Sequence, residues 1–486
     1  MRELRSIADG QHAAPGRRLG APRSRAWFIA LIVVVGGLLG YQIYHPVKRV
    51  IEAVAGLVLV YILANFSTLR ALWFLIIVFP FPFAISAGNS TFVFTLVLFV
   101  VYLVRASTHR ETLRGDRLFN LPIAFLVLSY ILSFYNQDTS GRLLQFAVLH
   151  TINFFAAVLF FYMIINTVNS ERKLARTITV MMVTCSLVIG FTFLELLFPN
   201  RQIIPGWLYT SQKITLIMKG ARMMGPFHDF ELNAEFFAMN VPFILLMVAR
   251  SRRLLVRSAY VLLALADLFM LFSTVTRGAF ISLMVGMLYL AWVSRKDLNF
   301  VKLVTYAGAF LAVIVGLNAF VARYTISGSL FQRIVGTTFE RGIIPENRFL
   351  SWTRAWNRGM EHPFIGHGPG WDLSRGIEFS LWPHDAYLYF FNIGGILGLA
   401  AFLFLLVRLV TATLPGYGSS LIRSPLPLAF MKALHVSLVI FIVDQIKIDY
   451  LRNEIYEYFI WLFFAMIAAT AAIIRNESRA RENSSP

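Results

Sequence analysis

A histidine and an aspartate stand side by side at the edge of an apolar segment. In LWPHDAYLYFFNIGG, residues 381–395, His384 and Asp385 directly precede the apolar run. Neither side chain is favourable in lipid. An imidazole can exchange a proton near neutral pH, and a carboxylate in this position can orient that ring or cap the helix that follows. The pair indicates either a reactive centre or an interfacial helix start.

Arginines near other apolar runs form a second candidate feature, because a planar guanidinium binds phosphate oxygens two at a time. Arg277, in STVTRGAF, is either a snorkelling side chain at a helix end or a fixed cation facing an outward cavity. The segment ARMMGPFHDFELNAEFFAMN holds five ionisable groups in fourteen residues, which is more than a helix cap needs. These groups are Arg222, His228, Asp229, Glu231 and Glu235.

The segment ENRFLSWTRAWNRGMEHPFIGHGPGW adds further arginines. Its spacing predicts a helix from about Arg348 to Met360, with Trp352 and Trp356 on one face. Such a helix suits the membrane–water interface as well as it suits substrate binding. The glycines after Pro363 follow no strand, so they form neither a dinucleotide-binding nor a P-loop fingerprint.

Composition places these residues in a membrane protein. Of 486 residues, 58% are hydrophobic and 14% are charged, and the apolar residues form runs of roughly 20. We therefore expect an all-α polytopic membrane protein, a bundle of about 12–14 transmembrane helices with a large helical outer loop. The lone Cys185 excludes an internal disulfide and a cysteine metal cluster. The candidate spans are residues 27–45, 49–67, 69–87, 90–104, 119–135, 144–166, 175–198, 233–249, 255–274, 278–294, 301–321, 385–409, 428–446 and 456–474.

The second to fourth of these spans are crowded and interrupted by proline. The break at Pro80-Phe81-Pro82 is either a kink or a re-entrant turn. Membrane helices tolerate such a break only where neighbouring groups satisfy the freed backbone. The predicted number of spans therefore varies by about one.

Lysine and arginine predict the orientation of the spans. Basic residues gather in alternate short loops and in both tails, so we expect both termini on the cytoplasmic side. Anionic lipid explains most of the net charge of +19, whereas arginine in long outer segments is better explained by an anionic ligand. The expected divisions are a disordered basic cytoplasmic tail at 1–26, a transmembrane bundle at 27–321 with an outer segment near 199–232, an outer loop domain at 322–384, transmembrane helices at 385–474 and a cytoplasmic tail at 475–486.

Four blocks in one order resemble a known family. They are RMMGPFHDFELNAEFFA, TVTRGAF, NRFLSWTRAWNRGMEHPFIGHGPGW and HDAYLYFFNIGGILGL, and they cover roughly residues 215–410. This order is similar to the O-antigen ligase and O-antigen polymerase superfamily of bacterial inner-membrane glycosyltransferases. Asp385 stands where the family commonly has Asn, and Thr276 where Ser is frequent.

The resemblance implies transfer of a glycan from an undecaprenyl diphosphate carrier to a sugar hydroxyl, on lipid A core or another lipid-linked glycan, in surface polysaccharide biosynthesis. The protein would be a multi-pass protein of the bacterial inner membrane, with its active site in the periplasmic segments. His384 would be the general base for the acceptor hydroxyl. Arg277, Arg222 and Arg348 would neutralise the diphosphate. Asp385, His228 and Asp229 would support them.

No cofactor and no metal are expected in this scheme, and no nucleic acid among the partners. The partners would be the lipid-linked donor, the acceptor glycolipid or glycan, and membrane lipids. The outer loops contain no Asp-x-Asp pair and no His-x-x-x-His spacing, which are common metal-ligand patterns.

Two other function classes stay open. A transporter or flippase of lipid-linked sugars would share this composition, but such proteins often show paired half-repeats, and we find no internal repeat. A non-catalytic subunit of an exopolysaccharide assembly would not need His384 or Arg277. Ligase and polymerase differ only in the acceptor, which leaves no pattern in the sequence.

Polar residues inside the spans have no assigned role. Asp267 lies in the middle of a span, where a charge costs about 2.5 to 3.5 kcal/mol on insertion scales unless it is paired or protonated. Glu195, Asp444 and His150 are similar cases. Each is either a buried structural partner or part of a lipid path.

Overall fold

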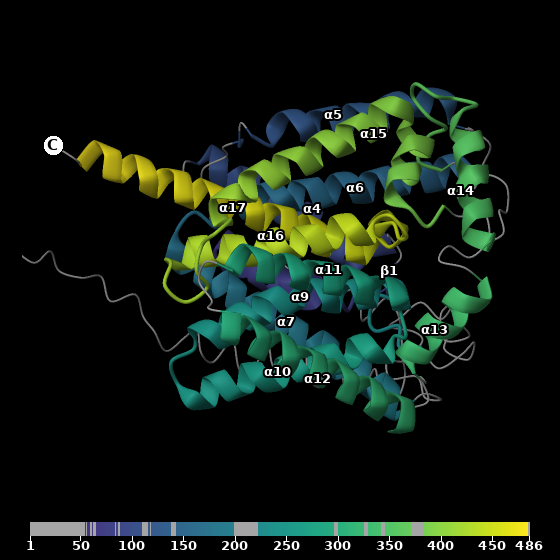
Figure 1. Ribbon diagram of the computed structural model, residues 1–486. Coiled ribbons are helices and arrows are strands. Elements are labelled where there is room, and N and C mark those ends of the chain that lie inside the picture. The colour runs from purple at the N-terminus through teal and green to yellow at the C-terminus, as the bar shows by residue number, and fades with distance from the viewer. Residues whose placement is uncertain are drawn as a thin grey trace, which may run out of the picture. The chain divides into compact units, whose positions relative to one another are not determined.

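The computed structural model of the chain is a set of long, nearly parallel helices (Figure 1). Two compact units divide the chain at residue 62, and nearly all the described residues belong to the second. The predicted tail at 1–26 and the predicted span at 27–45 lie outside the described residues. The structure describes residues 54, 56–58, 61, 65–82, 84–85, 88–108, 115–116, 118–137, 142–198, 222–295, 300–324, 329–341, 346–370 and 383–484.

Within these residues, ten helices are long and apolar enough to cross a membrane. This finding confirms the predicted all-α polytopic fold class. The ten are α4 (Ser90–Ser107), α6 (Arg142–Thr167), α7 (Glu171–Leu197), α9 (Phe230–Arg250), α10 (Leu254–Ser273), α11 (Arg277–Ser294), α12 (Phe300–Tyr324), α15 (Ala386–Thr413), α16 (Leu426–Asp444) and α17 (Glu454–Ser484). Shorter helices are α3 (Thr68–Val78), α5 (Asn120–Ser133), α13 (Leu330–Arg341), α14 (Glu346–Gly359) and the 3₁₀ turns η1 (Phe134–Asn136), η4 (Leu414–Gly416) and η5 (Tyr450–Arg452).

The proline break at residues 80–82 ends a helix and does not merely bend it. Helix α3 has 11 residues and covers about 16 Å, roughly half the hydrocarbon thickness. A short antiparallel pair follows, β1 (Ala84–Ile85) and β2 (Gly88–Asn89), before α4 begins. Proline lacks the amide hydrogen that would continue the helix, so the predicted span at 69–87 is a half-length helix with a turn.

The centre of the bundle is formed by the last helices of the chain. Of the residues in an 18-residue apolar stretch of α17, 89% are buried inside the protein, and the share in α9 is 78%. The corresponding share is only 17% in α12, which therefore lies at the periphery. A helix that is apolar all round and buried by its neighbours serves as a core element. Helix α17 is thus a fixed element against which the start of α9 and of α15 are set.

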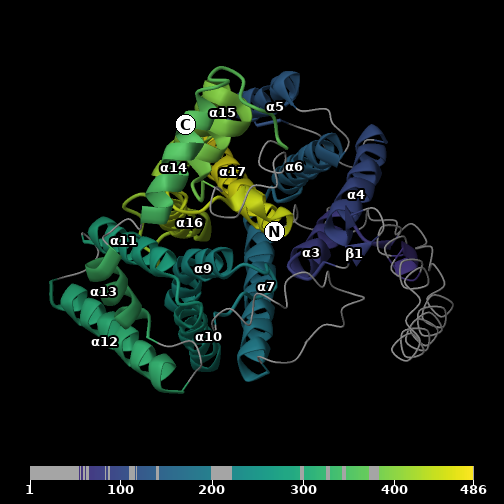
Figure 2. The ribbon, with the colours of Figure 1, turned by 90° about the vertical axis from the view of Figure 1, so that its right-hand side faces the viewer.

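Helices α13 and α14 lie across one end of the long helices, at the right of Figure 1. Figure 2 turns this end toward the viewer and shows α14 beside α15. The ring of Trp356 in α14 stacks on Phe391 in α15, with centroids 5.3 Å apart. A side chain at Gly359 would collide with the same ring, so the end of α14 packs closely on α15.

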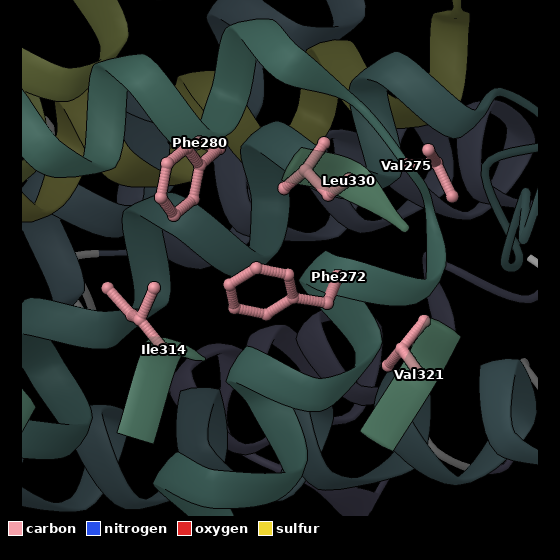
Figure 3. Close-up of a cluster of buried hydrophobic side chains, with 6 residues drawn as sticks. All are labelled: Phe272, Val275, Phe280, Ile314, Val321 and Leu330. Carbon is pink, nitrogen blue, oxygen red and sulfur yellow. The ribbon is translucent and has the colours of Figure 1, made fainter. Parts of the chain in front are cut away.

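A hydrophobic cluster fixes the turn between α10 and α11 (Figure 3). Phe272 and Phe280 flank this turn, with ring centroids 5.6 Å apart, and Leu330 of α13 packs against them. The cluster joins α10, α11, α12 and α13 and holds the backbone from which Arg277 starts. Its members are Phe272, Val275, Phe280, Ile314, Val321 and Leu330.

Helix α15 is broken near its start. Gly395 has φ 62° and ψ −157°, which no helix contains, and a Cβ there would lie 2.3 Å from the carbonyl carbon of Phe364. The loop after α14 crosses this break, because the amide of His367 donates to the carbonyl of Asn392 at 2.8 Å. The glycine-rich loop thereby fixes the short first segment of α15, which His384 precedes.

Candidate active site

Three helices of the bundle begin in the same strained way. Among the described non-glycine residues, only His228, Val275 and His384 have positive φ, at 53°, 50° and 47°. Each one directly precedes the N-cap residue of a helix, α9, α11 or α15 respectively. A positive φ costs free energy of order 1–3 kcal/mol for such residues and is found most often at functional sites.

His384 contacts a buried arginine from another part of the chain. Arg452 Nη1 lies 3.1 Å from His384 Nδ1, and Arg452 Nη2 donates to Asp229 Oδ1 at 2.7 Å and to Glu231 Oε2 at 3.0 Å. The side chain of Arg452 is 8% exposed. Charge-assisted hydrogen bonds of this length are the strong kind, so the guanidinium has a fixed orientation.

Arg348 brings α14 into the same cluster. Its Nη2 donates to Glu231 Oε1 at 2.7 Å, and its Nη1 donates to the carbonyl of Lys447 at 3.0 Å. Glu231 therefore lies between two guanidinium groups, one from α14 and one from η5. The carboxylate acts as the junction that fixes both cations, and Arg348 remains 27% exposed at the surface of the site.

Arg222 and Arg277 lie at the next helix start. Arg222 donates to the carbonyls of Thr274 and Val275 at 2.9 and 3.3 Å and to the hydroxyl of Thr276 at 3.0 Å. Its guanidinium carbon sits 3.4 Å above the centre of the Phe230 ring. Arg277, half-buried, is the first residue of α11 and follows Thr276 directly.

A lysine lies against the start of α11. Lys447 Nζ pairs with Asp444 Oδ1 at 2.7 Å, and Asp444 also accepts from the hydroxyl of Ser282 at 2.8 Å. A Cβ at Gly278 would lie 1.9 Å from Lys447 Nζ, so the lysine occupies the space that the glycine leaves. The Lys447 side chain thus lies beside Gly278, the residue that follows Arg277 in α11.

A group of buried hydrogen bonds lies behind the site, on the side of the helix bundle. Glu235 accepts from Gln445 Nε2 at 2.8 Å and from the hydroxyl of Tyr456 at 2.9 Å. The carbonyl of Gln445 accepts from the amide of Ala386 at 2.9 Å, two residues after His384. This chain of contacts ties α9, α16, α17 and the start of α15 together.

Charges and burial set the protonation of the site. Burial, assisted by Arg452 and Arg348, lowers the pKa of His384 from 6.5 to about 4, although Glu231 and Asp229 oppose the change. The imidazole is therefore neutral at neutral pH, and its 3.9 Å approach to Glu231 is not an ion pair there. Burial acts to lower the pKa of Arg452, but its carboxylate neighbours outweigh that effect and raise it.

Asp385 caps α15, which is one of the two roles that its position suggests. Its Oδ1 accepts from the amide of Leu388 at 2.8 Å. Burial raises the pKa of Asp385 to about 6, although these backbone hydrogen bonds act in the opposite direction. Asp229 caps α9 in the same way and also binds Arg452.

The structure gathers most of the residues that the sequence selected. His384, Asp229, Arg348 and Arg222 lie in one connected cluster, with Arg277 next to the Arg222 contact. His228 lies in the turn before Asp229, where its amide donates to the carbonyl of Gly225 at 3.2 Å. The roles of these residues stay predictions.

Arg452 and Lys447 were missed by the sequence analysis, and Glu231 was noted without a role. The available signal was the segment QIKIDYLRNEIYEY, residues 445–458, which carries five charged residues between two apolar runs. A short polar connection resembles an ordinary loop. Its importance follows only from tertiary pairing, because Arg452 contacts a residue 223 positions earlier.

The buried polar residues inside the spans have structural partners. Asp267 accepts from the thiol of Cys185 at 3.6 Å, and Glu195 accepts from the amide of Gly225 at 2.7 Å. His150 lies between the rings of Tyr130 and Tyr389. Within the described part of the chain, no group of three or more His, Cys, Asp or Glu side chains could hold a metal ion. Metal independence itself stays a prediction.

Fold and site define a multi-pass membrane protein with an imidazole and several guanidinium groups gathered at one end of its helices. The family model described as O-antigen ligase matches residues 259–403, which include Arg277, Arg348 and His384. The match supports the resemblance to the O-antigen ligase and polymerase superfamily, and it covers less than a third of the chain. The match leaves out Arg222, Glu231 and Arg452. No curated protein matches the chain.

Proposed function

We propose that the protein is a glycosyltransferase that moves a glycan from an undecaprenyl-diphosphate-linked donor to a hydroxyl of an acceptor sugar. The O-antigen ligase model that matches residues 259–403 supports a ligase- or polymerase-like role in surface polysaccharide synthesis. The donor, the carrier and the acceptor are our proposal. The observation that carries it is the meeting of His384 with Arg348, Arg452 and the Arg222 turn at one end of the bundle.

The cations suit the leaving group of this reaction. As the bond between C1 of the donor sugar and the diphosphate oxygen breaks, the electron pair leaves with the diphosphate, and the acceptor oxygen forms the new bond to C1. Guanidinium groups stabilise the developing negative charge without needing a proton transfer. The first turns of α9, α11 and α15 add the positive ends of three helix dipoles.

A lipid donor explains why the site lies at the end of the helices. The polyprenyl chain of the donor remains in the bilayer, and its diphosphate reaches the depth of the headgroups. His384 is 12% exposed and Arg348 27% exposed, which permits contact with a ligand from outside the protein. We propose that this end is periplasmic and that both chain termini are cytoplasmic, in line with the positive charge of the tails.

The acceptor is either lipid A core or a second lipid-linked glycan. The first acceptor would make the protein a ligase and the second would make it a polymerase. The two differ in what approaches the site from water, and the residues at the diphosphate would serve both. An assay with both acceptors separates them.

The test is glycan transfer by the purified protein in detergent, with a polyprenyl-diphosphate oligosaccharide and each acceptor. Arg277→Ala should lower transfer by about 10²-fold or more, because one anion-stabilising group is lost. The matched control is Arg408→Ala, since Arg408 lies near the far end of α15 beside Phe404. Transfer that is absent from wild type with both acceptors, or equal in the two variants, would overturn the proposal.

A further inference from the structure

A cavity of about 340 Å³ lies between α11, α16 and the end of α15. Helix α15 runs from the residue after the His384-Asp385 pair to Thr413, whose hydroxyl contacts His435 in the cavity wall. The cavity is therefore at the opposite end of the helices from His384. Its volume falls within the range of about 300–1,000 Å³ that is usual for small-molecule sites.

The walls of this cavity are fixed by the protein itself. The hydroxyl of Tyr289 lies 2.6 Å from Nε2 of His435 and joins α11 to α16. A Cβ at Gly416 would lie 2.6 Å from backbone atoms of α16, so η4 packs closely on that helix. The next residue, Tyr417, meets the ring of Trp292 edge-on, with centroids 5.8 Å apart. A ligand would find the cavity already formed, which lowers the entropic cost of binding.

The chemistry of the walls favours an acyl chain. Water needs two to four polar partners to stay in a cavity, whereas these walls are apolar and both ring nitrogens of His435 already contact hydroxyls. Trp292, Leu414 and Tyr417 line the cavity and are also exposed on the outer surface of the bundle. The cavity therefore opens toward the hydrocarbon of the bilayer, where a lipid tail gains dispersion contacts by filling it.

Arginine side chains lie around the same end of these helices. Arg295 directly follows α11, and its guanidinium carbon is 4.8 Å from the centre of the Trp292 ring in the cavity wall. The connection between Tyr417 and α16 carries the exposed Arg423, and Arg250 donates to the carbonyl of Ser424 at 2.7 Å. Guanidinium groups bind phosphate oxygens well, and basic pockets between membrane helices suit anionic headgroups.

We propose that this cavity binds one acyl chain of an anionic phospholipid, whose phosphate contacts Arg295. Lipid tails around the protein are as apolar as the cavity, so apolar contact alone does not select one lipid from another. The cation beside Trp292 provides the selection. In the proposed orientation the cavity opens to the cytoplasmic leaflet, and the proposed glycan transfer takes place at the other end of the helices.

Quenching of Trp292 fluorescence tests the site in vesicles that contain the full-length protein. The vesicles contain phosphatidylethanolamine with a minor share of phosphatidylglycerol, and an equal mole fraction of one or the other lipid carries bromine on its acyl chains. The chain has 9 tryptophans, so the Trp292 signal is the difference between wild type and Trp292→Phe. Brominated phosphatidylglycerol should occupy the site about fivefold more than brominated phosphatidylethanolamine, the preference expected from one arginine at a membrane surface. Equal quenching by the two lipids would overturn the proposal.

Two arginine variants separate a site from a general effect of charge. Arg295→Gln should abolish the preference for phosphatidylglycerol at Trp292. Arg408→Gln is the matched control, because Arg408 lies near the same end of α15 but beside the Phe404 ring, outside the cavity wall. This control should keep the full preference. An equal loss in both variants would mean that overall charge attracts the lipid, which would contradict the proposal.

A pair of valine variants tests the cavity. Val410→Phe fills part of it, because Val410 lines the wall, whereas Val407→Phe places the same ring on an exposed position of the same helix. The first variant should lower quenching by phosphatidylglycerol to the level of phosphatidylethanolamine, and the second should leave it unchanged. Equal quenching in the two variants would show that the lipid does not enter the cavity.

Undecaprenyl phosphate tests the other lipid occupant. Its chain carries a methyl branch on every isoprene unit and is wider than an acyl chain, so it should not displace brominated phosphatidylglycerol when added at an equal mole fraction. Displacement at a lower mole fraction would assign the cavity to a polyprenyl chain and overturn the proposal. None of these measurements depends on glycan transfer, so the lipid site and the proposed function can fail separately.

Discussion

The molecule contains two well-anchored histidines near opposite ends of its helices, and they differ in every neighbour. His435 of α16 is bonded on both nitrogens by hydroxyls, Tyr289 at Nε2 and Thr413 at Nδ1, each at 2.6 Å. His384 instead meets a guanidinium that two carboxylates hold. Hydroxyl groups occupy both ring nitrogens of His435, which indicates a structural role. At His384, a guanidinium held by two carboxylates meets Nδ1 and fixes the position of the ring.

The surroundings of the two histidines differ as strongly. Beside His435 lies an apolar cavity of about 340 Å³. Its walls are Tyr289, Trp292, Val410, Leu414, Tyr417, His435, Leu438 and Val439. Around His384 the groups are ionised and the backbone is strained before each helix. Packing accounts for the surroundings of His435. It does not account for the charged groups and the strained backbone around His384, which are consistent with binding of a charged ligand.

We expect the largest difference in transfer activity between variants of the two histidines. His384→Ala should lower glycan transfer by about 10² to 10³-fold with little change in thermal stability, because the imidazole expected to take the proton of the acceptor hydroxyl is removed. His435→Ala should leave turnover unchanged and lower the free energy of unfolding by about 1–3 kcal/mol, since two hydroxyls lose their partner. Transfer assays and thermal unfolding of both variants measure this. Equal losses of activity would remove the distinction.

Arg348 gives the next largest effect. Arg348→Ala removes a donor and frees Glu231 Oε1, so transfer should fall by about 10²-fold. Arg354→Ala is the matched control, because Arg354 lies on the same helix and is exposed. The measurement is the initial rate of transfer over a range of donor concentrations. Similar rates in the two variants would show that α14 serves only as an interfacial helix.

Gly278 gives a smaller effect through Lys447. Gly278→Ala should displace Lys447 from Asp444, because the new methyl group needs the place of the ammonium, and the flexible lysine can move. We expect about a tenfold loss of transfer with the fold retained. Gly316→Ala is the control, since nothing lies within 4 Å of a Cβ at Gly316. A fully active Gly278→Ala variant would exclude a role for Lys447 at the site.

The pH dependence should be the smallest change. Because the pKa of His384 is lowered to about 4, the ring stays neutral as the pH falls from 8 to 5. In an Asp385→Asn variant, which lacks the carboxyl whose pKa is raised to about 6, transfer should therefore stay nearly level over this range. An unperturbed histidine would ionise near pH 6.5 in the same range. The measurement is kcat/KM across these pH values in detergent. A steep fall centred near 6.5 would mean that His384 is not buried among these cations.

The helices could be predicted from the sequence because lipid imposes runs of about 20 apolar residues. Several site residues could be selected because the ionisable residues beside the apolar runs are more numerous than helix capping requires. These residues are Arg222, Asp229, Arg348 and His384. The break at residues 80–82 was expected as a kink or a re-entrant turn, but the half length of α3 could not be chosen, because hydropathy does not record where a proline ends the hydrogen-bond ladder.

Arg452 could not be selected, because its role depends on pairing with residues from α9 and α15. A contact across 223 residues leaves no local pattern. The orientation of His384 depends on the same pairing, so its role as the general base stays a prediction. Single residue types near a membrane surface indicate where a site lies, and their neighbours in space determine what each one does.

In the reaction that we propose, the protein transfers a glycan and releases the lipid diphosphate. Proteoliposomes that contain the purified protein, a polyprenyl-diphosphate oligosaccharide and an acceptor test it in one measurement, which counts glycan transferred and carrier diphosphate released. We predict one carrier diphosphate for each transferred glycan, and at least about 10²-fold less of both products with His384→Ala. An intact donor that moves between leaflets without losing its glycan would contradict the account and indicate a transporter.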